Sequence, residues 1–189
     1  MRRRSAVAFA LVMALAASAC AGPFGRSKPD AYAIPPDACT LLDDGVVQAF
    51  LGAGAAVKPP TIEDDPQDCV WKRADESPAL TARWESLATF VLLYRTDSKK
   101  SGEERAKAIY AVRITPGYRH KCKVAADECR YRVIGRQSTV DPPRVDVLVR
   151  KDNVILQGIL DGDLVTVNQP ETMAPVATRL ATSLTQRLG

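Results

Sequence analysis

Histidine is almost missing from this sequence, since His120 is the only one in 189 residues. A general base or a metal ligand needs suitable partners, but His120 lies between Arg119 and Lys121. Neighbouring cations repel a metal ion. We therefore expect His120 to lie in a solvated basic loop, and we expect neither a metal site nor a cofactor site built on it.

The local motifs of common enzymes are also missing. The sequence contains no Gly-x-Ser-x-Gly nucleophile turn, no phosphate-binding glycine loop and no calcium loop. Catalysis would then need two convergent carboxylates, which a sequence does not locate. The acidic residues Asp152, Asp161 and Asp163 are typical of turns. We therefore expect a protein that is not an enzyme, with a carboxylate-dependent hydrolase as the alternative.

Net charge is small once the first segment is set apart. The formal net charge is +4, but residues 1–19 contain Arg2, Arg3 and Arg4 and no acid, so residues 20–189 carry +1. A nearly neutral domain lacks the basic surface that attracts a phosphate backbone. Nucleic acid is therefore excluded as a partner.

The longest apolar run near the start is too short to span a membrane. Residues 5–19 follow the three arginines and end in Ala17-Ser18-Ala19, directly before Cys20, whereas a spanning helix needs about 20 apolar residues. Arginines, a short apolar run, small residues and a cysteine form the order of a bacterial lipoprotein export signal. We therefore predict a signal peptide at 1–19 and a lipid such as palmitate on Cys20, which would anchor the protein to the outer face of the cell membrane.

Two alternatives to this anchor remain. Ordinary signal peptidase could cut after Ala19 and release a secreted protein with a free Cys20, or the leader could stay uncleaved. The number of cysteines favours lipidation, because an oxidising compartment pairs four of the five and leaves one over. The four cysteines of the domain are Cys39, Cys69, Cys122 and Cys129.

Residues 20–36 are expected to form a flexible, lipidated tether. The segment 21–36 contains four prolines and has neither a helical nor a strand period. Fully extended, it would reach at most about 50 Å. The following residues, 37–189, suffice for one hydrophobic core but hardly for two domains. We therefore expect a single globular domain at 37–189.

Three helices are expected in this domain. The first follows Asp43 as N-cap and ends at Gly52, the second spans 102–112, and the third begins at Thr172 as cap and extends to Leu188. The expected core-facing residues of the first two helices are Leu42, Val46, Ala49, Phe50, Ala106, Ile109, Tyr110 and Val112. In the third helix they are Met173, Val176, Ala177, Leu180, Ala181, Leu184 and Leu188.

Six strands are expected from β-branched and aromatic runs. They span 69–73, 88–96, 130–134, 144–150, 154–160 and 164–168. The turns at 151–153 and 161–163 contain Asp, Asn and Gly, which tolerate a positive φ angle and are typical of hairpins. We therefore predict an α+β fold: a mainly antiparallel sheet of five or six strands packed with about three helices and stabilised by two disulfides.

Several motifs are similar to those of a known family. Asp37-x-Cys39-x-Leu41-Leu42, then Phe50-Leu51-Gly52 and Cys69-Val70-Trp71, resemble an actinobacterial lipoprotein family of unknown function. Two features differ: Val46 replaces the Glu that would close a capping box, and a Gly-x-Gly-Asp-like turn is missing near Gly135. The resemblance implies an extracytoplasmic lipoprotein with a Cys39–Cys69 disulfide, and it implies no activity.

Four cysteines allow three pairings, and the residues themselves leave all three open. We predict Cys39–Cys69, as the resemblance implies, together with Cys122–Cys129. The second pair would close a loop of eight residues and join the basic segment 119–123 to the strand expected from Arg130. We expect a non-catalytic domain that binds an unidentified envelope protein or a small ligand at the cell envelope. A purely structural envelope protein is a further alternative.

Overall fold

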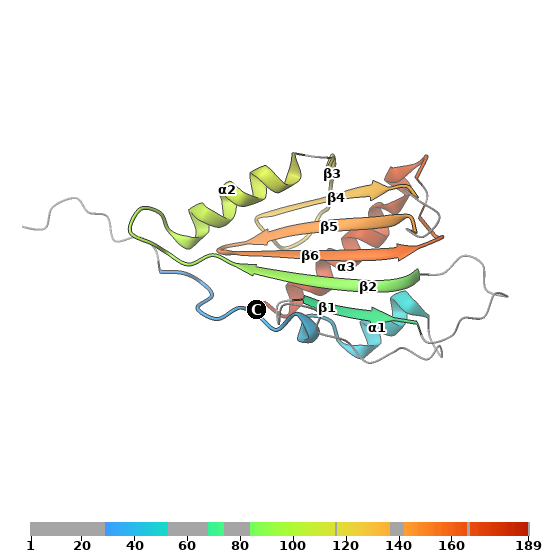
Figure 1. Ribbon diagram of the computed structural model, residues 1–189, viewed down its shortest axis with the longest axis horizontal. Helices are drawn as coiled ribbons and strands as arrows, with labels where there is room; N and C mark the ends of the chain where they lie inside the picture. Colours follow the sequence, from blue (N-terminus) through green and yellow to red (C-terminus); the bar gives the residue numbers. More distant parts are fainter. Residues whose placement is uncertain are drawn as a thin grey trace, which may run out of the picture.

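The computed structural model describes residues 29–52, 68–73, 84–115, 117–136, 142–165 and 167–188. In this part of the chain, six strands form one antiparallel sheet in the order β1-β2-β6-β5-β4-β3 (Figure 1). The strands are β1 (Asp68–Lys72), β2 (Trp84–Leu93), β3 (His120–Lys121), β4 (Glu128–Ile134), β5 (Arg144–Lys151) and β6 (Val154–Gly162). The helices are α1 (Asp44–Leu51), α2 (Gly102–Ile114) and α3 (Ala174–Gln186), with 3-10 turns η1 (Ala38–Thr40) and η2 (Pro170–Met173). The α+β class and the antiparallel sheet are as predicted.

The centre of the sheet is the β5–β6 hairpin, which turns at Asp152 and Asn153 as predicted. Asp152 has a φ angle of 50°, a conformation that aspartate tolerates better than most residues. The strand predicted at 164–168 is wrong, because β6 continues through Asp161, which pairs with Arg144. The described residues after Gly162 form turns instead of a returning strand.

The face of the sheet that carries the main core is covered by α1 and α3; α3 lies behind the sheet in Figure 1. Gly158 of β6 makes room for α3, since a Cβ there would come within 2.8 Å of Leu180 Cδ2. Thr172 does not cap α3, as its hydroxyl donates to the Gln169 carbonyl within η2. Instead α3 begins after Met173 with Pro175 in its first turn, where a missing N–H has no cost.

Asp43 caps α1 as predicted, by accepting a hydrogen bond from the Val46 N–H. The predicted core face of α1 is shifted, because Ala49 is exposed while Val47, Phe50 and Leu51 are buried. Leu42 is buried but precedes the helix, so it does not mark the helical face.

The other face of the sheet is covered by α2 over part of its area. Ala106 and Tyr110 of α2 are fully buried against Leu148 and Ile155. Because Ala106 and Tyr110 are four positions apart, they form one narrow stripe along the helix, and α2 packs on the sheet through that stripe. Val112, which was expected to face the core, is therefore 69% exposed, and Ile109 is 37% exposed.

The two expected disulfides fasten the edges of the sheet. Cys39–Cys69 joins η1 to β1, and Cys122–Cys129 joins the end of β3 to β4. His120 does not lie in a loop but in the short strand β3, where its ring stacks on Tyr131 at 5.0 Å between centroids. The basic segment 119–123 is thus in part an edge strand.

The start of the described chain lies against the domain. Residues 29–36, which belong to the expected tether, hydrogen-bond to the body through Asp30 and Tyr32. The predicted signal peptide and Cys20 lie outside the described residues. Among the described residues, no helix is both long and apolar enough to cross a membrane.

Candidate functional site

A group of charged and polar side chains lies on the sheet face that carries α2, beyond the area that α2 covers. Strands β4, β5 and β6 contribute Arg132, Arg144, Asp146, Gln157 and Asp161, β2 adds Ser86, and the loop after α2 adds Tyr118. We call these seven residues the Asp146 cluster. Side chains alternate between the faces of a strand, so these residues point to the side opposite the α3 core.

Asp146 is the centre of the cluster. Its side chain is fully buried, and its Oδ2 accepts hydrogen bonds from Arg132 Nε at 2.8 Å and Nη2 at 2.6 Å. The Tyr118 hydroxyl lies 3.5 Å from the same oxygen. Arg132 in turn stacks over the Tyr118 ring, with its guanidinium carbon 4.5 Å from the ring centroid. A buried carboxylate needs such partners, because desolvation of an unpaired charge is costly.

The second oxygen of Asp146 is held less well. Oδ1 lies 3.4 Å from Arg144 Nε, which is an ion pair without hydrogen-bond geometry. Within the described part of the chain, neither Asp146 Oδ1 nor Arg144 Nε has a hydrogen-bond partner, although both atoms are buried. Buried polar atoms without partners are rare in native proteins. Among the described residues, these two atoms therefore depend on their ion pair alone.

Asp161 provides a second carboxylate on the neighbouring strand. It lies directly opposite Arg144 in the register of β5 and β6, and its Oδ2 accepts a hydrogen bond from the Ser86 hydroxyl at 2.8 Å. Burial raises the pKa of Asp161, while Ser86 and Arg144 act in the opposite direction. Two arginines thus balance two carboxylates, so the cluster is formally neutral.

The rim of the cluster is partly exposed to solvent. The Arg144 side chain is 40% exposed, while the side chain of Arg132 is 24% exposed. Burial raises the pKa of Tyr118 to about 12, with a smaller contribution from Asp146, so Tyr118 remains a neutral donor at physiological pH. Gln157 donates to the Tyr118 oxygen at 3.3 Å. The arrangement offers fixed donors and acceptors to a small polar molecule.

The residues considered from the sequence are distributed differently. His120 is in β3 and outside the cluster, while Asp152 is in the β5–β6 turn and Asp163 pairs with Arg136 at 3.1 Å. Only Asp161 of those turn acids belongs to the cluster. Among the described residues, no group of three potential metal ligands occurs.

Sequence reasoning missed most of the cluster, including Arg132, Arg144, Asp146 and Tyr118. The available signal was the period of two in the strand 144–150, where charged side chains at Arg144 and Asp146 alternate with valines. Such alternation predicts a polar face, but it does not show whether that face is buried.

Comparisons with protein family models, with curated proteins and with solved structures find no match to this chain.

Proposed function

We propose that this protein is a lipid-anchored lipoprotein on the outer face of the cell membrane, with a non-catalytic domain that binds a small polar ligand at the Asp146 cluster. The main support for a lipid anchor is that the four cysteines of the domain pair with one another. Cys20 is then the one cysteine outside these two pairs. Disulfides are typical of oxidising, extracytoplasmic compartments. The leader sequence and the resemblance to actinobacterial lipoproteins support the same assignment.

The binding role rests on the buried Asp146–Arg144 pair. Within the described part of the chain, its atoms Asp146 Oδ1 and Arg144 Nε make no hydrogen bond. A purely structural envelope domain would gain more from apolar residues at this place, since a buried ion pair is often no better than hydrophobic packing. The Arg144 side chain is 40% exposed, so a polar ligand would accept hydrogen bonds from its guanidinium group beside the buried carboxylate.

A hydrolase is the second candidate, and a specific observation favours it. Asp146 and Asp161 lie on one face of neighbouring strands, and burial raises the pKa of Asp161. A raised pKa makes a carboxyl group better suited to act as a general acid. Asp146 is less suited to the complementary role, because two arginines already engage its charge.

Replacing Cys20 with Ser should abolish lipidation. The variant is expected to leave the membrane fraction or to remain unprocessed, because the thiol that would carry the lipid is gone. Mass spectrometry of the mature N-terminus of the native protein measures the modification directly. An unmodified Cys20 on the mature protein would contradict the anchor.

Replacing Arg144 with Gln should weaken binding of the ligand. The protein is isolated from its own envelope in mild detergent, and small molecules that stay bound are identified by native mass spectrometry. We expect a bound polar molecule with the native protein and a severalfold lower occupancy with Arg144→Gln, because the ligand loses a charged donor.

Arg136→Gln is the matched control, since Arg136 forms a half-exposed ion pair outside the cluster. Equal occupancy in both variants would contradict the site. If the native protein releases a cleaved product while Asp161→Asn retains the intact molecule, the hydrolase is the better assignment.

A further inference from the structure

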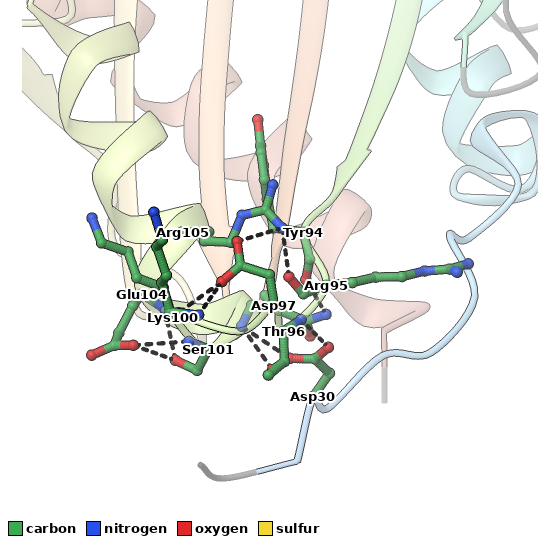
Figure 2. A network of polar contacts seen from close by, with 12 residues as sticks. Asp30, Tyr94, Arg95, Thr96, Asp97, Lys100, Ser101, Glu104 and Arg105 are labelled. Atoms are coloured by element: carbon green, nitrogen blue, oxygen red, sulfur yellow. Dashed lines mark hydrogen bonds and ion pairs between the residues drawn. The ribbon is translucent and has the colours of Figure 1, made fainter.

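The segment 29–36 is attached to the domain at three places, and we call it the strap. Figure 2 shows the first attachment, where the Asp30 carboxylate meets the loop before α2. Thr96 donates to Asp30 through its backbone N–H and its hydroxyl, both at 2.7 Å, and the Gly102 N–H donates at 3.1 Å. These hydrogen bonds, led by that of the Thr96 hydroxyl, lower the pKa of Asp30, so Asp30 accepts them as a carboxylate at neutral pH.

Gly102 is the residue that makes this attachment possible. It is the first residue of α2, directly after the N-cap Ser101. A Cβ at this position would overlap both the Tyr94 carbonyl oxygen and the Asp30 carboxylate. The helix therefore begins with the one residue type that lets a carboxylate approach its first N–H closely.

Tyr32 makes the other two attachments. Its backbone N–H donates to Asn153 Oδ1 at 3.0 Å, and Asn153 Nδ2 donates back to the Tyr32 carbonyl at 2.9 Å. The Tyr32 hydroxyl donates to the Leu188 carbonyl at 2.8 Å, just beyond α3. Asn153 is fully buried in the β5–β6 turn, so its amide is a fixed partner. The strap thus follows a defined path over the domain.

This path shortens the distance between the proposed anchor and the domain. Only residues 21–28 separate Cys20 from the strap. The nine Cα-to-Cα steps from Cys20 to Pro29 span at most about 30 Å when fully extended. The average end-to-end distance of a flexible chain of that length is about 17 Å. The end of the domain at Thr96 and Gly102 must therefore remain close to the lipid.

The Asp146 cluster lies at the opposite end of the sheet. The strap attaches where β2 ends and the β5–β6 hairpin turns, as Figure 1 shows. Ser86 and Asp161 pair near the start of β2, seven residues before Leu93. At about 3.3 Å per residue, that places Ser86 and Asp161 about 23 Å along the strands from the strap, and Asp146, whose neighbour Ile159 pairs with Ala88, about 17 Å from it.

The loop beside the strap exposes cations. Arg95, Lys99 and Lys100 are exposed, and the half-exposed Asp97 carboxylate accepts from the backbone N–H groups of Lys99 and Lys100, both at 2.8 Å. Asp97 also pairs with Arg105 at 3.5 Å (Figure 2). Loop 95–100 contains three cations and one acid, so it carries a net charge of +2. A positively charged loop is attracted to anionic headgroups.

We infer that the strap fixes the orientation of the anchored domain: loop 95–100 faces the anionic lipid headgroups, and the Asp146 cluster faces away from the membrane. This inference rests on the proposed anchor at Cys20. In this orientation, loop 95–100 contacts the membrane in which the lipid is inserted. The proposed ligand site stays accessible from the side opposite that membrane.

The test uses the lipidated full-length protein in vesicles that contain phosphatidylglycerol and a headgroup-linked quencher. A fluorescent unnatural amino acid is placed at Ser98 in one sample and at the exposed Glu85, near the start of β2, in another. We expect quenching to be severalfold stronger at Ser98 than at Glu85. Asp30→Ala should reduce this difference, because the strap loses its contacts with Thr96 and Gly102 and keeps those of Tyr32.

Two matched controls accompany the strap variant. Ile34→Ala changes a strap residue that is 77% exposed and should preserve the difference. Lys99→Gln with Lys100→Gln should reduce quenching at Ser98, whereas Lys72→Gln with Arg119→Gln removes the same charge from exposed sites outside the loop and should not.

The outcomes separate the orientation from the anchor. Equal quenching at Ser98 and Glu85, in protein that mass spectrometry finds lipidated, would overturn the orientation and leave the anchor intact. Protein that carries no lipid and does not float with the vesicles would overturn the anchor itself. A difference between Ser98 and Glu85 that is undiminished in Asp30→Ala would overturn the role of the Asp30 attachment in setting the orientation.

Discussion

Cys39→Ala together with Cys69→Ala is expected to lower the free energy of unfolding by about 3–4 kcal/mol. The disulfide closes a loop with a sequence separation of 30, and the chain-entropy model assigns that stabilisation to a loop of this length. It also fastens η1 to β1, the strand at one edge of the sheet. Urea denaturation of the variant and the native protein, followed by circular dichroism, measures the difference.

The second disulfide provides the internal comparison. Cys122–Cys129 has a sequence separation of 7, so the same model gives about 2.5 kcal/mol for Cys122→Ala with Cys129→Ala. The first pair should therefore stabilise the domain more than the second. A larger loss from the Cys122–Cys129 variant would contradict the entropic account of both bonds.

Replacing Arg132 with Met is expected to lower the free energy of unfolding by about 3 kcal/mol. The substitution keeps most of the apolar contact but leaves the fully buried Asp146 without its two short hydrogen bonds. Arg144 remains 3.4 Å away, which holds the loss near the lower end of the range for a broken buried pair. Denaturation in urea at neutral pH gives the value.

A second substitution tests the reason for that loss. Adding Asp146→Leu to Arg132→Met removes the buried charge, so most of the lost stability should return. Arg136→Met serves as the control, because Arg136 and Asp163 are both about half exposed and such pairs contribute at most about 1 kcal/mol. If Arg132→Met lowers the free energy of unfolding no more than Arg136→Met does, the buried charge of Asp146 does not require Arg132 for its stabilisation.

Strand positions and helix ends were predictable where local chemistry decides them. The 151–153 turn, the Asp43 cap and α2 were all expected, since turn residues, capping residues and periodicity act within a few positions. The strand expected at 164–168 failed because β6 extends through Asp161 to pair with Arg144 and β2, and long-range pairing outweighs a local turn signal.

The Asp146 cluster was not predictable for a related reason. Arg132 and Asp146 are neighbours only through the β4–β5 register, and Asp161 joins them only through β6. A sequence shows alternating charges but not which face α2 covers. The strap was missed because its prolines indicate a tether, whereas two side chains, Asp30 and Tyr32, find distant partners.

The strap also orders the events of folding. Its hydrogen bonds join Asp30 and Tyr32 to residues between 66 and 156 positions later in the chain. A chain that emerges with its N-terminus first therefore cannot complete these contacts until the segment that ends in Leu188 has followed. Contacts of such sequence separation form slowly, because a long loop must close before they are made. The first described segment of the chain is thus among the last to reach its final place.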